Sequence, residues 1–98
     1  LINSGCTDIS NLYTGEVTDI CGVITNVRKI TTRKGHKMAF LELDDSTAIA
    51  DITVFPRTWQ SCLQDEIDIG KLIKMNVKVE EEEPRFKLIA NKIDIYKE

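Results

Sequence analysis

The sequence has one histidine, three cysteines and no long apolar run, and each shortage excludes a class of protein. Cys6, Cys21 and Cys62 are an odd number without a CxxC spacing, so we expect buried or partly buried thiols in a reducing compartment. His36 lies among basic residues that would repel a metal ion, so no metal site is expected. The apolar runs are too short for a membrane span, and the first residues resemble no signal peptide. Together these features predict a cytoplasmic protein without membrane contact.

Catalytic motifs are missing as well. Phosphate-cradling glycine motifs are absent. Ser46 and Ser61 have no histidine nearby in the sequence to act as a base, and Cys62 has no obvious base. Asp44 and Asp45 are typical turn residues, because their side chains bond their own backbone. We therefore predict no catalytic residue, no cofactor and no enzymatic activity of this chain by itself.

The charge that is present is unevenly distributed. The 98 residues include 13 Lys or Arg and 16 Asp or Glu, which gives a net charge of −3 and argues against DNA binding by the whole surface. No acidic residue lies between Asp19 and Glu42, whereas five of the 13 basic residues lie between Arg28 and Lys37. This asymmetry indicates an anionic partner for one part of the surface.

From residue 16 onward the pattern is mostly that of strands. Residues 1–15 are rich in turn formers, and we expect a linker or an N-terminal arm ahead of a domain of residues 16–98. The first strand carries apolar residues on both parities, which indicates a long strand bent near Gly22 and shared by two halves of a barrel. The remaining strands alternate, with Ala39, Leu41 and Leu43 as one inner face. Strands are expected over 17–30, 38–44, 48–55, 72–79 and 85–96.

Pro56 ends the third strand and suits the start of a helix over 57–67. Trp59, Leu63 and Ile67 recur at helical spacing and form one apolar stripe, so Trp59 is expected in the core. The fold class is therefore all-β with one short helix. Three strands, a helix and two strands are the order of the five-stranded Greek-key OB-fold barrel, with the helix between strands three and four. Another small β-rich sandwich is the alternative.

An OB fold binds ligands across strands two and three, between the loop joining the first two strands and the loop joining the last two. Residues 31–37 then form the first of these loops, with Gly35 in its turn. Single-stranded nucleic acid needs cations for phosphates and aromatic faces for bases, and Phe40 points outward from strand two. The candidate nucleic-acid-binding residues are Arg28, Lys29, Thr32, Arg33, Lys34, His36, Lys37 and Phe40.

Acidic residues oppose this interpretation. Glu42 and Asp51 share the face of Phe40, and Glu80–Glu83 approach the second loop, so we expect weak, salt-sensitive binding. Two alternatives involve no nucleic acid. The charged hairpin tip would simply be solvated, and Phe40 would pack under a loop or a neighbouring domain.

The sequence also resembles a known family in two stretches, CGVITNVRKITTRKGHKMAFLELDDSTAIADITVFP and LIKMNVKVEEEEPRFKLIANKI. It is similar to the OB-fold domain of the bacterial DNA polymerase III alpha subunit, over about Val17 to Ile95. The resemblance implies a tRNA-anticodon-type OB module that contacts single-stranded template DNA through Arg33, Lys34 and Lys37. The transferase reaction of DNA replication would belong to other domains of the polymerase chain, which would be a partner, with other replisome subunits as further candidates. The four-glutamate run and residues 1–15 depart from the family pattern.

Two other functions stay open. One is an RNA-binding OB module, such as the anticodon-binding part of a class II aminoacyl-tRNA synthetase. The other is a protein-docking module in the replisome, for which the acidic run and an exposed Phe40 or Phe55 would provide the surface.

Overall fold

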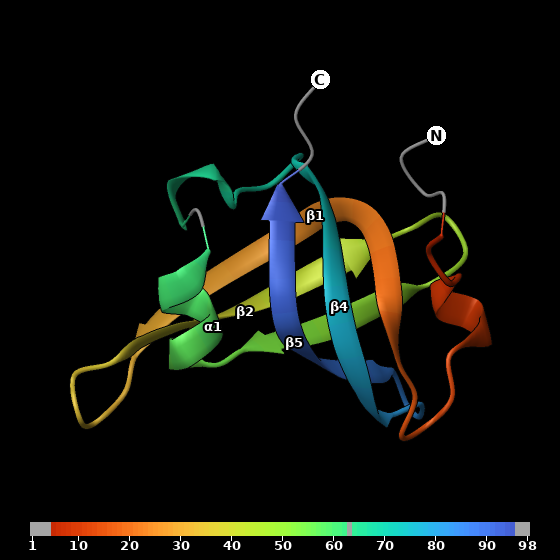
Figure 1. Cartoon of the computed structure of the whole chain (residues 1–98), viewed down its shortest axis with the longest axis horizontal. Coiled ribbons are helices and arrows are strands. Elements are labelled where there is room, and N and C mark those ends of the chain that lie inside the picture. The colour runs from red at the N-terminus through yellow and green to blue at the C-terminus, as the bar shows by residue number, and fades with distance from the viewer. Residues whose placement is uncertain (1–4, 63, 96–98) are drawn as a thin grey trace.

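The computed structural model describes residues 5–62 and 64–95, which form a small barrel covered at both ends (Figure 1). The helical elements are the 3-10 turn η1 (Ile9–Asn11), the helix α1 (Pro56–Ser61) and the 3-10 turn η2 (Gln64–Glu66). The strands are β1 (Val17–Thr31), β2 (Lys37–Asp44), β3 (Ile49–Val54), β4 (Leu72–Glu81) and β5 (Phe86–Ile95). The barrel closes in the order β1-β2-β3-β5-β4, with β3 and β5 parallel. The predicted five-stranded barrel with a helix between strands three and four is confirmed.

The long first strand serves both halves of the barrel, as its apolar pattern predicts. β1 pairs with β4 over Val17–Val23 and with β2 from Val23 to Thr31. Gly22 lies at this crossing, and a Cβ atom there would stand 2.8 Å from the Asp44 carbonyl oxygen. The register shift lies further on, between Ile24 and Asn26. The glycine therefore permits the close approach of β2, and the bulge at Thr25 adds to the bend.

The core follows the predicted alternation. The inner faces of β2, β3 and β4 are fully or almost fully buried, because each of these strands keeps one parity toward the barrel axis. In β5 the inward parity changes between Ala90 and Ile93. The reason is that Asn76 pairs with Lys92 whereas Val77 pairs with Ala90, which leaves Asn91 as an extra residue. This bulge moves Ile93 onto the inner face.

The helix is shorter than the one predicted over 57–67. α1 ends at Ser61, and Cys62 has extended backbone angles, φ −105° and ψ 169°. The thiol of Cys62 and the side-chain amide of Gln64 donate to the Trp59 carbonyl oxygen at 3.1 and 2.9 Å, so side chains satisfy the end of the helix. Trp59 and Ile67 are nonetheless buried, at 2% and 1% exposure, and cover one barrel end. Leu63 lies outside the described residues.

Residues 5–15, the described part of the segment predicted as a linker or an N-terminal arm, lie against the other barrel end (Figure 1). Ile9 and Leu12 are buried in the core, and the Ile9 N–H donates to the Asp45 carboxylate at 2.8 Å. Cys6 and Cys21 form a disulfide. The prediction of three reduced thiols is therefore wrong for these two, because folding the segment back onto β1 brings residues 15 positions apart together.

Cys62 is the free cysteine of the described residues, and its partial burial raises the pKa of its thiol. Within residues 5–62 and 64–95, no group of histidine, cysteine or acidic side chains is suited to holding a metal ion. Over the same ranges, no helix has the length and apolar character needed to cross a membrane.

Candidate nucleic-acid interface

The outer face of β1, β2 and β3 carries the first part of the predicted site. Arg28 pairs with Phe40 in the β1–β2 ladder, and Phe40 pairs with Thr53 in the β2–β3 ladder. Because directly paired residues point to the same side of a sheet, these three side chains form one row across the strands. The alternating neighbours Leu41 and Ile52 fill the core. The period of two thus presents Arg28 and Phe40 outward together.

Arg28 and Phe40 are in direct contact. The guanidinium carbon of Arg28 lies 4.8 Å from the centroid of the Phe40 ring, which is a cation–π distance. Phe40 is half-buried. The exposed part of the Phe40 ring therefore lies beside the Arg28 guanidinium. Nucleic-acid bases stack on guanidinium planes as well as on aromatic rings.

A hollow of about 240 Å³ opens beside this pair. Its lining is mostly polar and offers both hydrogen-bond donors and acceptors, with the Phe40 ring as an apolar part. The residues that line it are Asn26, Arg28, Phe40, Leu41, Glu42, Asp51, Ile52 and Thr53. Polar groups beside an aromatic ring form a surface that suits a nucleic-acid base, whose edge carries donors and acceptors.

The β1–β2 loop is a tight hairpin tip held by Thr32 and Gly35. The Thr32 N–H donates to the His36 carbonyl at 2.7 Å, and the Gly35 N–H donates to the Thr32 carbonyl at 2.9 Å. The Thr32 hydroxyl oxygen accepts the His36 N–H at 3.1 Å, so this side chain supports the turn. Gly35 has a φ of +84°, which other residues rarely adopt.

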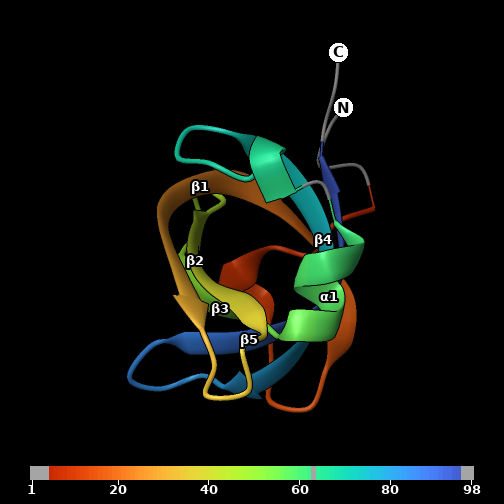
Figure 2. The ribbon, with the colours of Figure 1, turned by 90° about the vertical axis from the view of Figure 1, so that its left-hand side faces the viewer.

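The hairpin tip extends beyond the strands (Figure 1 and Figure 2), and its basic side chains are exposed. They are Arg33, Lys34, His36 and Lys37. None of them forms an ion pair within residues 5–62 and 64–95. Their donors therefore remain available to an anionic ligand.

Lys29 lies apart from the other candidates. It pairs with the core residue Ala39, and its ammonium stands 5.8 Å from the centroid of the buried Trp59 ring. Lys29 and the tip residue Lys37 both line a second hollow of about 310 Å³, which also borders Trp59. The structure thus groups Arg28 with Phe40 and the tip residues with one another, but it directs Lys29 toward the helix.

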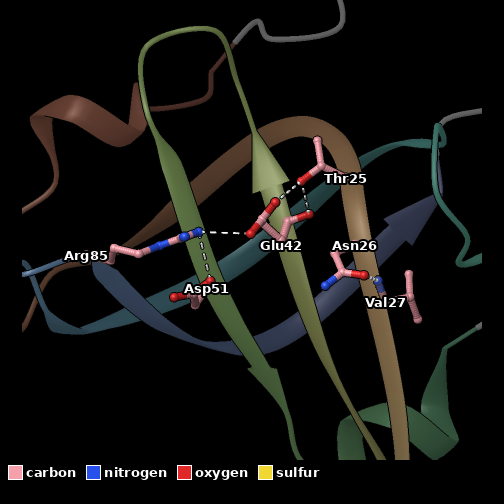
Figure 3. Close-up of polar contacts among 6 residues, drawn as sticks. All are labelled: Thr25, Asn26, Val27, Glu42, Asp51 and Arg85. Carbon is pink, nitrogen blue, oxygen red and sulfur yellow. Dashed lines mark hydrogen bonds and ion pairs between the residues drawn. The ribbon is translucent and has the colours of Figure 1, made fainter.

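Arg85 belongs to the same face and was not among the predicted site residues. Its Nη2 atom lies 3.1 Å from Glu42 Oε2 and 3.0 Å from Asp51 Oδ1 (Figure 3). Thr25 donates its hydroxyl to the other oxygen of Glu42 at 2.7 Å. This hydrogen bond first, and then the one from Arg85, lower the pKa of Glu42 below its usual value. The sequence feature that could have pointed to Arg85 is its position as a single arginine directly after four glutamates and a proline.

Comparison with known families now decides the identity of the fold. The sequence model described as an OB-fold nucleic acid binding domain matches residues 18–96. The chain belongs to this family. No protein of curated function matches the OB-fold domain in sequence.

Solved structures resemble the OB-fold domain over most of its length. The second OB-fold domain of replication protein A from Methanococcus maripaludis matches with a TM-score of 0.67 and 18% identity, covering 94% of this chain and 95% of that one. A replication factor A related protein from Methanobacterium thermoautotrophicum gives 0.69 and 22%, covering 93% and 90%. A mitochondrial single-stranded DNA binding protein from S. cerevisiae gives 0.63 and 15%, covering 87% and 98%. At these identities the likeness shows a shared fold.

The β4–β5 turn of the OB-fold domain carries the acidic run. Glu82 accepts hydrogen bonds from the backbone N–H and the hydroxyl of Thr14, at 2.9 and 2.8 Å, and these bonds lower the pKa of Glu82. Glu81 pairs with Lys87 at 3.7 Å. Glu82 therefore holds the N-terminal segment, and Glu81 contacts β5. The β4–β5 turn lies at the end of the barrel opposite the β1–β2 tip (Figure 1).

Proposed function

We propose that this OB-fold domain binds single-stranded DNA across the outer face of β1, β2 and β3. The observation that carries the proposal is the contact of Arg28 with Phe40 beside the hollow, on the face that lies between the two hairpin loops. Binding is weak and salt-sensitive, because the net charge is −3 and Glu80–Glu83 repel phosphate at one end.

Each part of the face has a chemical role in this proposal. A base stacks on the surface made by Phe40 and the Arg28 guanidinium. Arg33, Lys34 and Lys37 hold phosphates, with His36 as a further donor at the tip, while Thr32 shapes the turn that presents them. None of these contacts reads one base over another, so the binding tolerates sequence variation. No catalytic step is part of the proposal.

The comparisons support this proposal in two ways. The family is one of nucleic-acid-binding domains. The similar structures are those of replication protein A relatives and a single-stranded DNA binding protein, as their names state.

Fluorescence anisotropy with labelled oligo-dT tests the proposal. We expect saturable binding at low salt that weakens as salt rises, and a weaker affinity with a smaller salt slope for Arg33→Glu/Lys34→Glu. The control is Lys71→Glu/Lys92→Glu, which makes the same change of charge at two exposed lysines outside the face. Equal losses in both double variants would show that only net charge matters, and the loop assignment would then be wrong.

RNA is the second candidate ligand, because stacking and phosphate contacts operate on both nucleic acids. Oligomers of DNA and RNA with the same sequence, titrated side by side, separate the two. A clear preference for RNA would replace the DNA proposal with an RNA-binding module.

The wider setting of the domain rests on the sequence resemblance described above. In that setting the domain is part of a cytoplasmic bacterial DNA polymerase III alpha chain and contacts its template strand. Its partners are then the rest of that chain and, if it also serves as a docking module, other replisome subunits. Co-purification of the tagged natural full-length protein with polymerase activity tests this. A full-length protein without a polymerase domain would overturn it.

A further inference from the structure

We infer that Arg85 is a positioning residue that lets a nucleic-acid strand bind to this face, because it compensates part of the negative charge of Glu42 and Asp51. This inference rests on the proposed function and deepens it. It concerns the second loop of the site, where the acidic sequence alone predicts repulsion.

The two carboxylates are neighbours because of the strand register. Glu42 on β2 pairs directly with Asp51 on β3, so both side chains emerge on the same outer side of the sheet. Both also line the hollow beside Arg28 and Phe40. Any nucleic-acid strand with a base stacked on Phe40 therefore passes over two acidic side chains.

Arg85 reaches this pair through the topology of the barrel. It directly precedes β5, whose first residue, Phe86, pairs with Ala50 in the parallel β3–β5 ladder. This pairing brings the guanidinium beside Asp51, and one nitrogen bridges both carboxylates at 3.0 and 3.1 Å (Figure 3). A side chain from the second loop thus compensates the charge of strands two and three.

The charge being compensated is permanent at neutral pH. Hydrogen bonds from Thr25 and Arg85 hold the pKa of Glu42 below its ordinary value, so Glu42 stays ionised. With Arg85 in place, the cluster of Glu42, Asp51 and Arg85 carries one net negative charge. Without Arg85, the cluster carries two negative charges at the hollow.

The bridge is too exposed to serve mainly as a stabiliser. The side chains of Arg85, Asp51 and Glu42 are 46%, 44% and 30% exposed. Ion pairs with this exposure contribute little to folding, because water screens them. The same exposure places their charge where an approaching phosphate meets it.

The experiment measures oligo-dT affinity by anisotropy at low salt for Arg85→Ala and for Arg85→Ala/Glu42→Gln/Asp51→Asn. Removal of Arg85 is expected to weaken binding roughly 3- to 10-fold. The triple variant is expected to bind as tightly as the wild type or more tightly, because the acidic charge is gone as well. Lys92→Ala, which removes an exposed cation elsewhere on β5, is the control and should stay within about twofold. Thermal melting should show all variants folded.

Each result has a distinct meaning. An Arg85→Ala variant that binds like the wild type would overturn the inference and leave the proposed function intact. A triple variant that remains as weak as Arg85→Ala would mean that Arg85 touches the nucleic acid itself, and its role through the two carboxylates would be wrong. A wild-type domain that binds no oligomer would overturn the proposed function, and the inference with it.

Discussion

Arg28 and Phe40 face each other across the β1–β2 ladder, with the guanidinium carbon 4.8 Å from the ring centroid. The ring and the cation thus form one surface. A substitution at either residue therefore changes both the position of the positive charge and the area on which a base can stack. Four predictions follow from this contact and from three others that shape the barrel around it.

Replacing Phe40 by leucine should weaken single-stranded DNA binding. Leucine keeps apolar bulk over the sheet but removes the aromatic face, and loss of stacking costs about 1–3 kcal/mol of binding free energy. Anisotropy titration with oligo-dT measures the effect. Phe55→Leu is the matched control, since Phe55 is 46% exposed at the end of β3 and does not line the hollow. Similar losses in both variants would remove the special role of Phe40.

Gly22→Ala should destabilise the barrel by about 1–3 kcal/mol, because overpacking forces neighbouring groups apart. The new methyl group would stand 2.8 Å from the Asp44 carbonyl oxygen and 3.0 Å from the Leu43 side chain. Backbone on the partner strand cannot yield as a flexible side chain does. Urea denaturation measures the change. Val23→Ala, at an exposed neighbouring position, should change stability by no more than about 0.5 kcal/mol, and an equal cost at both positions would argue against the clash.

Asp45→Asn should loosen the N-terminal segment. Burial raises the pKa of Asp45, but hydrogen bonds from Thr47, Ile9 and Ala48 outweigh burial and leave the pKa below its usual value. A pKa lowered by folding stabilises the protein above the unfolded value of about 3.9, and this stabilisation is lost as pH falls through the folded value. We expect the variant to be about 1–2 kcal/mol less stable at neutral pH, since it loses charge-assisted hydrogen bonds. The difference from the wild type should shrink below about pH 4.

Denaturation curves across the acidic range test this prediction. Asp68→Asn is a suitable control, because Asp68 is exposed and its carboxylate accepts the N–H of the adjacent Ile69. A gap between wild type and Asp45→Asn that stays constant with pH would contradict the role of the Asp45 charge.

Reduction of the Cys6–Cys21 disulfide should lower stability by about 3 kcal/mol, as expected for a closed loop of this length. The bond joins residues separated by 15 positions and holds the segment that carries Ile9 to β1. Denaturation with and without reductant measures the effect, and Cys62→Ser should preserve it. Thiol titration of the unfolded, unreduced chain should find one reactive cysteine. Three reactive thiols would show that the bond does not form.

The parts of the fold that depend on local periodicity were predictable from the sequence. Leu41, Leu43 and Ile52 are buried and alternate with residues that are less buried, and a period of two assigns them to one inner face. The end of α1 was not predictable in this way. The apolar stripe continues to Ile67, but side-chain hydrogen bonds from Cys62 and Gln64 end the helix earlier.

The candidate site also has one part that the sequence predicts and one part that it does not. Arg28 and Phe40 lie on strands joined by one hairpin, so their juxtaposition follows from outward parity and a short loop. Arg85 and Glu42 are 43 positions apart and meet only through the parallel register of β3 and β5. No sequence pattern specifies that register. The disulfide was missed because an odd cysteine count gives no pairing rule.

The parallel ladder between β3 and β5 has a consequence for how the barrel opens. It consists of four residue pairs, from Ala50–Phe86 to Thr53–Ile89, whereas β4 and β5 pair along most of their length. Parallel pairing is slightly weaker per residue, and this ladder joins segments distant in sequence. Local unfolding should therefore start at the β3–β5 ladder. The amide hydrogens of its residues should exchange with solvent sooner than those of β4. Because Arg85 directly precedes the first residue pair of this ladder, local unfolding there would also separate Arg85 from Asp51.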